Sequence, residues 1–201
     1  DRGDSQCGLK PDGYFATVPE GLFDNAAACG RCVRVTNPDN RLFVEAQIID
    51  HCYGNESGWC KPDSKNISLN PEAMNALGIE PLTDAGDDDE EESLKAGTSM
   101  HWHYIPCSGE DYDTVKYRLH RDSNDHWFAV QVRNHRNPIA AVEVKQGDKW
   151  VSAERQNWNF WVVEGGGCCG SGPFEMRITD LFGNKLTDTI PNEKDVEISG
   201  K

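Results

Sequence analysis

The chain of 201 residues carries 34 acidic and 20 basic side chains, a formal net charge of −14. Such an acidic chain does not bind nucleic acid by neutralising its phosphates, which needs clustered Lys and Arg. No apolar run approaches the roughly 18 residues that cross a bilayer, so the sequence also excludes a membrane protein. An apolar content of 37% suffices for a core, and the length predicts one large all-β domain or two smaller domains.

The cysteine content indicates an oxidising compartment. Eight cysteines, an even number, are typical of disulfides in a secreted protein. A zinc site would need paired Cys-x-x-Cys knuckles, and only Cys29 and Cys32 have that spacing. The sequons at Asn55 and Asn66 predict glycosylation. We therefore expect a secreted glycoprotein in its mature, processed form, without a metal or a cofactor.

The first half of the chain predicts mostly strands. Strands are expected over residues 32–36, 42–49 and 100–105, where β-branched and aromatic residues gather. Residues 37–40 form a turn, and residues 70–77 a short helix that Asn70 caps and Gly78 ends. The acidic run 84–92 is expected to be a solvated loop, because it lacks the spaced ligands and central Gly of a calcium loop.

The second half of the chain has the alternation of short strands and turns that is typical of a β-sandwich. Short strands separated by turn signals are expected over residues 116–119, 127–132, 140–144, 160–163 and 174–178. Residues 1–107 carry 19 acidic and 8 basic side chains, whereas the rest of the chain carries 15 and 12. This shift in charge predicts two domains, 1–107 and 114–201, joined by a linker over 108–113.

The cysteines divide between the same two domains. All eight are expected in disulfides: Cys7, Cys29, Cys32, Cys52, Cys60, Cys107, Cys168 and Cys169. Six in the first domain suffice for three bridges, which favours a bond between the adjacent Cys168 and Cys169. The alternative, in which each reaches a different partner, stays open, as does the connectivity, since eight cysteines allow 105 pairings.

Several strings, in this order, resemble an expansin. In the first half they are residues 28–36, 47–52, 58–60, 69–73 and 102–107, and in the second half 127–138, 177–183 and 187–191. The resemblance implies a six-stranded double-psi β-barrel, related to that of family-45 glycoside hydrolases, followed by an immunoglobulin-like β-sandwich that acts as a carbohydrate-binding module. Expansins bind cellulose and loosen plant walls without detectable hydrolysis.

The resemblance also implies a polar groove in the barrel. Asp50 and Thr17 match groove positions of the family, although Asp50 would also suit the start of a turn. Ser68 stands where the family has the Asp most closely tied to loosening, and a serine is no acid near neutral pH. Inverting hydrolysis needs two carboxyl groups, so we expect no hydrolytic activity. A glycan on Asn66 would also crowd the groove. Asp63 is an alternative source of a second carboxylate.

Aromatic residues are expected to contact sugar rings. Tyr14 and Trp59 are candidates for the barrel groove, with core packing as the alternative. In the sandwich, the resemblance implies a row of three coplanar surface aromatics at His126, Trp127 and Trp158.

Other aromatic positions of the sandwich have different expected roles. Trp161 and Phe128 follow the phase of strand interiors and are assigned to the core. His120 stands where many microbial expansins have Lys, either as part of the binding face or as an incidental neighbour.

The combined hypothesis is a secreted, monomeric, non-enzymatic protein that binds and loosens plant cell walls. Its expected partners are cellulose, xyloglucan or mixed-linkage glucan, since an acidic barrel is repelled by polyanionic pectin. One alternative is a paralogue that binds cellulose without loosening. The other is a polysaccharide hydrolase or a lytic transglycosylase on the same barrel.

Overall fold

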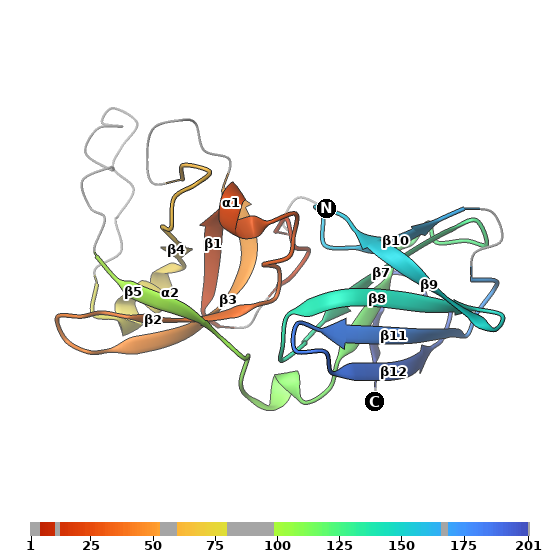
Figure 1. The fold of residues 1–201 in the computed structure, drawn as a ribbon. Helices are drawn as coiled ribbons and strands as arrows, with labels where there is room; N and C mark the ends of the chain where they lie inside the picture. Colours follow the sequence, from red (N-terminus) through yellow and green to blue (C-terminus); the bar gives the residue numbers. More distant parts are fainter. Residues whose placement is uncertain (1–4, 11–12, 53–59, 80–98, 166–168, 201) are drawn as a thin grey trace. The chain divides into compact units, whose positions relative to one another are not determined.

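The computed structural model describes residues 5–10, 13–52, 60–79, 99–165 and 169–200. Predicted features at Asn55, Trp59, the run 84–92 and Cys168 lie outside these residues. The chain divides into two compact units, shown in Figure 1. The first unit comprises Asp1–Asp24 and Arg31–Ile105, and the second comprises Asn25–Gly30 and Pro106–Lys201. The predicted all-β class is confirmed.

The first unit is built on a sheet with strand order β4-β1-β3-β2-β5. Its strands are β1 Phe15–Pro19, β2 Cys32–Thr36, β3 Phe43–Cys52, β4 Ser68–Leu69 and β5 His101–Ile105. β1 and β3 run parallel, and the other neighbours pair antiparallel. Its described residues also form two short helices, α1 Glu20–Phe23 and α2 Pro71–Ala76.

The strands of the first unit alternate between buried and accessible side chains. Ala16 and Val18 on β1 are fully buried, whereas Thr17 between them is partly accessible. The register between β1 and β3 shifts at this point, so that Ala16 pairs with Ile48 but Thr17 pairs with Asp50. This bulge keeps apolar residues on the core face on both sides of the irregularity.

Helix α2 begins where the sequence predicts, with Asn70 at the N-cap position, but the Asn70 side chain does not cap the helix. The Asn70 side chain makes no cap hydrogen bond. Instead, its Oδ1 accepts from the Phe15 backbone N–H at 3.0 Å, and its Nδ2 donates to the Gly13 carbonyl at 3.1 Å. The predicted N-cap position is therefore confirmed, whereas the side-chain cap bond is replaced by tertiary bonds near the start of β1. Gly78 follows the helix with φ at +73°, as a helix end requires.

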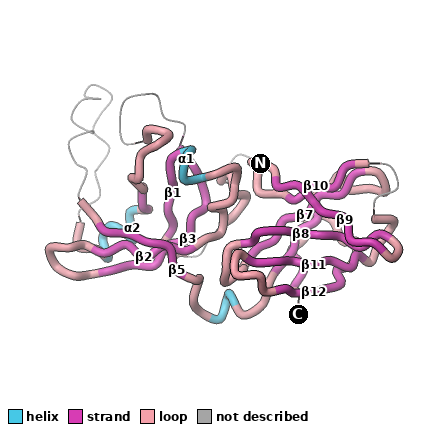
Figure 2. Tube along the Cα trace, in the orientation of Figure 1, coloured by secondary structure: helices cyan, strands magenta, loops and turns pink. Residues whose placement is uncertain are grey.

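The second unit is an antiparallel sheet with strand order β12-β11-β8-β9-β10-β7-β6-β13, and Figure 2 shows its strands in magenta joined by loops in pink. Its strands are β6 Lys116–Leu119, β7 Trp127–Arg133, β8 Ile139–Gln146, β9 Lys149–Arg155, β10 Trp161–Glu164, β11 Phe174–Asp180, β12 Lys185–Ile190 and β13 Glu197–Ser199. A 3-10 turn, η1, covers Glu110–Tyr112. The five strands expected in this half are confirmed, four of them with shifted ends. β9, β12 and β13 were not predicted.

One apolar cluster joins opposite ends of this sheet. It contains Tyr117 from β6 and Ile190 from β12, both fully buried. Because β12 is at one end of the strand order and β6 is next to the other end, the sheet folds over on itself as a sandwich. Phe128 and Trp161, 1% and 6% exposed, belong to this core, as the phase of their strands predicts.

Disulfides brace the fold. Cys52 at the end of β3 is bonded to Cys60, eight residues later in the chain. Every other described cysteine is also disulfide-bonded, including Cys169, which confirms that part of the prediction. Within the described residues, no helix has the length and apolar character to cross a membrane.

Candidate functional site

The first unit brings three predicted site residues into one row across its sheet. Thr17 on β1 pairs with Asp50 on β3 and, on its other side, with Ser68 on β4. In an antiparallel pair such as Thr17 and Ser68, opposite side chains project from the same face about 5 Å apart, and Asp50 is the partner of Thr17 on the parallel side. Thr17 and Asp50 are partly buried and Ser68 is exposed. We call these three residues the polar row.

Backbone donors hold the carboxylate of the polar row. Asp50 Oδ1 accepts hydrogen bonds from the backbone N–H groups of Gln6, at 3.1 Å, and His51, at 2.9 Å. The next side chain, His51, is buried and stacks on Phe23 with ring centroids 4.3 Å apart. Its Nε2 lies 3.0 Å from a carboxylate oxygen of Glu20. These contacts fix the strand end that presents Asp50.

Within the polar row, Asp50 supplies the carboxylate and the other two members supply hydroxyl groups. Asp63, the alternative second carboxylate, lies in an exposed turn that a hydrogen bond from the Ser64 N–H to the Lys61 carbonyl closes at 2.9 Å. It is therefore outside the strand register that aligns the row. Asn66 is exposed, two residues before Ser68.

Tyr14 immediately precedes β1 and is 38% exposed. Its backbone carbonyl accepts from the Gln47 N–H at 3.0 Å, which anchors the residue beside β3. The predicted partner Trp59 lies outside the described residues. Another aromatic residue, Trp102 on β5, donates its Nε1–H to the Lys65 carbonyl at 2.8 Å and so ties the stretch before Ser68 to the sheet.

The second unit carries an aromatic cluster of His120, Trp127, Trp158 and Phe160. The Trp127 and Trp158 rings lie 14° from parallel, with centroids 6.5 Å apart. His120 stands edge-on to both, at 5.2 Å from Trp127 and 5.6 Å from Trp158. Phe160 contacts Trp158 at 4.6 Å and His120 at 5.3 Å. Two of the three predicted binding aromatics are therefore in mutual ring contact.

Strand alternation places this cluster on the face opposite the core. On β7, Phe128 belongs to the core cluster, whereas Ala129 and Trp127 belong to a separate apolar group with Phe160. Trp127 and Trp158 are partly buried and pack on that group. Each indole thus has an apolar support beneath it and part of its surface open to solvent, the arrangement that stacking on a sugar ring requires.

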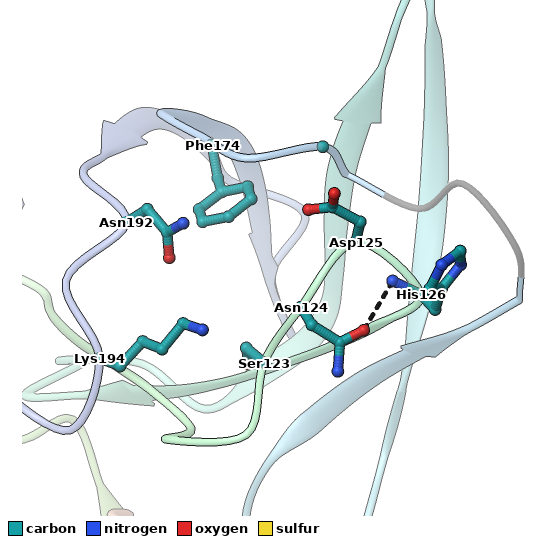
Figure 3. Close-up of a pocket in the computed structure, with 8 residues that line it drawn as sticks. Ser123, Asn124, Asp125, His126, Phe174, Asn192 and Lys194 are labelled. Carbon is teal, nitrogen blue, oxygen red and sulfur yellow. Dashed lines mark hydrogen bonds between the residues drawn. The ribbon is translucent and has the colours of Figure 1, made fainter.

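His120, more than His126, joins the tryptophans. His126 is exposed on a turn where its N–H donates to Asn124 Oδ1 at 2.8 Å, as Figure 3 shows. In the part of the chain that the structure describes, the histidine in ring contact with Trp127 and Trp158 is His120. A sequence signal existed for this position, because Tyr117 and Leu119 point inward and the alternation therefore turns His120 outward.

Sequence comparison identifies relatives for both units. The model of the expansin C-terminal domain matches residues 115–191. Expansin-like protein 1 of Dictyostelium discoideum is 25% identical over 180 residues, which cover 89% of this chain and 56% of the relative. Expansin-YoaJ of Bacillus subtilis (strain 168) is 36% identical over 128 residues, which cover 62% of this chain and 46% of the relative. The chain spans about half the length of the curated relatives it matches.

Solved structures agree with the sequence matches. The apo expansin of Clavibacter michiganensis is 25% identical and superposes with a TM-score of 0.71, over 96% of this chain and 86% of that one. A mutant of the same expansin, solved in complex with cellohexaose, superposes equally well. The likeness over both units confirms the predicted fold class, a double-psi β-barrel followed by an immunoglobulin-like sandwich. These matches identify an expansin C-terminal domain over residues 115–191 and show that the chain is expansin-like over both units.

Proposed function

We propose that this protein is secreted, binds cellulose and related neutral β-glucans through the aromatic cluster, and loosens plant cell walls without hydrolysis. The observation that carries the proposal is the near-parallel pair Trp127 and Trp158, supported from beneath and open to solvent. A flat glucan chain presents apolar C–H faces that bury well against indole rings. Each stacked Trp contributes about 1–3 kcal/mol of binding free energy.

The polar row supports the absence of hydrolysis. Inverting hydrolysis needs one carboxyl group as acid and a second as base, with a water between them. The row offers the Asp50 carboxylate beside the hydroxyl groups of Thr17 and Ser68. Such a set suits hydrogen bonds to sugar hydroxyls and leaves the position of the base without a titratable acid.

The net charge and the similarity to a solved expansin support a neutral polysaccharide as the partner. A net charge of −14 opposes binding to the anionic pectins of plant walls, most strongly at low salt. The solved expansin from Clavibacter michiganensis was crystallised with cellohexaose, an uncharged glucan fragment. Disulfides at every described cysteine support an extracellular location.

The test combines three measurements on the intact chain: cellulose pull-down, creep of heat-inactivated plant wall, and release of reducing sugar. We expect binding and creep without sugar release. Trp127→Ala with Trp158→Ala should abolish binding, whereas Trp150→Ala, a tryptophan of β9 that packs under Arg177, should not. Unchanged binding in the double variant, or sugar release by the native chain, would overturn the proposal.

A second candidate is a protein that binds cellulose but does not loosen walls. The exposed Ser68 at the end of the polar row favours this candidate, because a carboxylate is expected there from the resemblance. Creep separates the two, since both predict binding and only the first predicts wall extension.

A further inference from the structure

A pocket of about 350 Å³ opens beside the aromatic cluster, within the second unit. The turn from Ser123 to His126 forms one wall, and Gly170, Phe174, Asn192 and Lys194 form the rest, as Figure 3 shows. We propose that this pocket binds a neutral side-chain sugar of a substituted β-glucan whose backbone lies on the aromatic cluster. The inference rests on the proposed function and adds a preference for branched over linear chains.

The polar groups of the pocket fall into two sets. Ser123 and Asn124 build the turn: the Ser123 hydroxyl both donates to and accepts from the Ala129 backbone at 3.1 Å, and the Asn124 amide bonds within the turn. Asp125 and Lys194 are different. Among the residues that the structure describes, their side chains make no ion pair and no hydrogen bond. Figure 3 shows Lys194 extending between Asn192 and Ser123.

This second set provides complementary groups for sugar hydroxyls. Asp125 accepts hydrogen bonds and Lys194 donates them. Asn192 donates its Nδ2–H to the Ser171 carbonyl at 2.9 Å, which fixes the amide and leaves its oxygen as an acceptor. A hydroxyl group both donates and accepts, so a ring bearing several of them can satisfy all three side chains at once.

Charge argues for an uncharged ligand. One carboxylate and one ammonium line the space, so their charges balance, and a charged sugar of either sign meets one like charge beside one opposite charge. Like charges brought together in a confined site oppose binding. A neutral sugar meets no such repulsion, and its size suits a cavity at the lower end of the range for small-molecule sites.

The pocket walls are held in place before any ligand arrives. A side chain at Gly172 would put its Cβ 2.9 Å from the Asn192 Cβ and 3.2 Å from the Phe174 ring. Gly172 also has φ at +77°, a conformation that glycine adopts without strain. The segment before β11 therefore packs closely on Asn192 and Phe174, and Phe174 is itself only 5% exposed.

A single turn connects the pocket with the aromatic cluster. Asn124 Oδ1 accepts from the N–H of His126 at 2.8 Å and from that of Trp127 at 3.2 Å. The Asn124 N–H also donates to the Trp127 carbonyl at 2.7 Å. His126 lines the pocket, and its neighbour Trp127 belongs to the cluster, so the same turn builds part of both sites.

The test is calorimetric titration of the intact chain with cellotetraose and with the same backbone carrying single xylose substituents. We expect the substituted ligand to bind about tenfold more tightly, as hydrogen bonds to two charged groups imply. Asp125→Asn with Lys194→Met should remove that advantage and leave cellotetraose binding unchanged. Asp148→Asn with Lys149→Met, an exposed pair in the β8–β9 hairpin, makes the same charge changes as a control.

The outcomes separate the two proposals. Equal affinity of the native chain for both ligands would overturn the proposed role of the pocket. Loss of binding to both ligands in the pocket variant would also overturn it, because the linear backbone would then occupy the pocket. Failure of cellotetraose to bind would overturn the proposed function instead. In that case, NMR shifts of His126 and Lys194 on addition of xylose would still support the pocket, and their absence would overturn it.

Discussion

The rings of Trp127 and Trp158 lie 14° from parallel although their residues are 31 positions apart in the chain. Strand pairing alone does not align two indoles, because each ring turns about its own side-chain bonds. The imidazole of His120 stands edge-on to both rings, with interplanar angles of 86° and 72°. His120 therefore acts as the spacer that sets the shared plane of the two tryptophans.

Removal of this spacer should weaken cellulose binding. Edge-to-face ring contacts contribute about 0.5–1.5 kcal/mol each beyond buried area, so His120→Ala should lower cellulose affinity about three- to tenfold. The measurement is a binding isotherm on microcrystalline cellulose. His120→Phe keeps a ring and should restore most of the affinity, and His101→Ala, an exposed histidine of the first unit, serves as the control. Native affinity in His120→Ala would contradict the spacer.

The polar row predicts a gain of function at its exposed end. Ser68 faces Thr17 across β1 and β4, so Ser68→Asp would place a second carboxylate in line with Asp50. We expect wall creep to increase in this variant, while cellulose binding by the second unit stays the same. Ser68→Ala is the matched control, because it also removes the sequon at Asn66 but adds no carboxylate. Equal creep in the two variants would contradict the prediction.

Two substitutions of Asp50 should distinguish its structural role from its functional role. Its Oδ1 accepts two backbone N–H groups, and an asparagine oxygen can accept the same bonds. Asp50→Asn should therefore fold with nearly native stability yet lose creep activity. Asp50→Ala leaves both donors without their acceptor and should cost about 1–3 kcal/mol of unfolding free energy. Denaturant unfolding checks stability, and full creep in Asp50→Asn would exclude a role for the charge.

The regular part of the fold follows from local patterns. Strands such as Lys116–Leu119 alternate strictly between apolar and polar residues, and the sequence predicts their limits. β9 escaped prediction because its inward residues, Val151 and Ala153, are small and its opposite face mixes Trp150, Ser152 and Glu154, so the alternation of apolar and polar residues is weak. The Asn70 side-chain cap bond failed for a related reason, since the bonds that claim its amide come from Phe15 and Gly13, 55 and 57 residues away.

The candidate sites depended on contacts between distant segments. Resemblance identified Asp50, Thr17 and Ser68, but their alignment needs the register shift between β1 and β3, which no periodicity predicts. The resemblance left His120 either as part of the binding face or as an incidental neighbour, because its contacts with both tryptophans arise from the pairing of β6, β7 and β10. The pocket needs three segments to meet, and none of them carries a motif.

A buried tyrosine in the core of the second unit should make the free energy of unfolding fall at alkaline pH. Burial raises the pKa of the Tyr117 phenol well above its ordinary value, and the Asp188 carboxylate acts in the same direction. Below pH 10 Tyr117 is neutral in both the folded and the unfolded chain, so its contribution is complete. Above about pH 10 the unfolded chain releases the proton while the folded chain retains it, and stability falls by about 1.4 kcal/mol per pH unit.

Denaturant unfolding between pH 8 and 11 measures this decline. Tyr117→Phe removes the ionisable group, so its stability should fall less steeply with pH than that of the native chain. Tyr14→Phe alters an exposed tyrosine instead and should keep the native slope. Parallel curves for the native chain and Tyr117→Phe would show that the alkaline loss arises elsewhere. The comparison of slopes is independent of any constant stability change from loss of the hydroxyl group, because such a change shifts the whole curve equally.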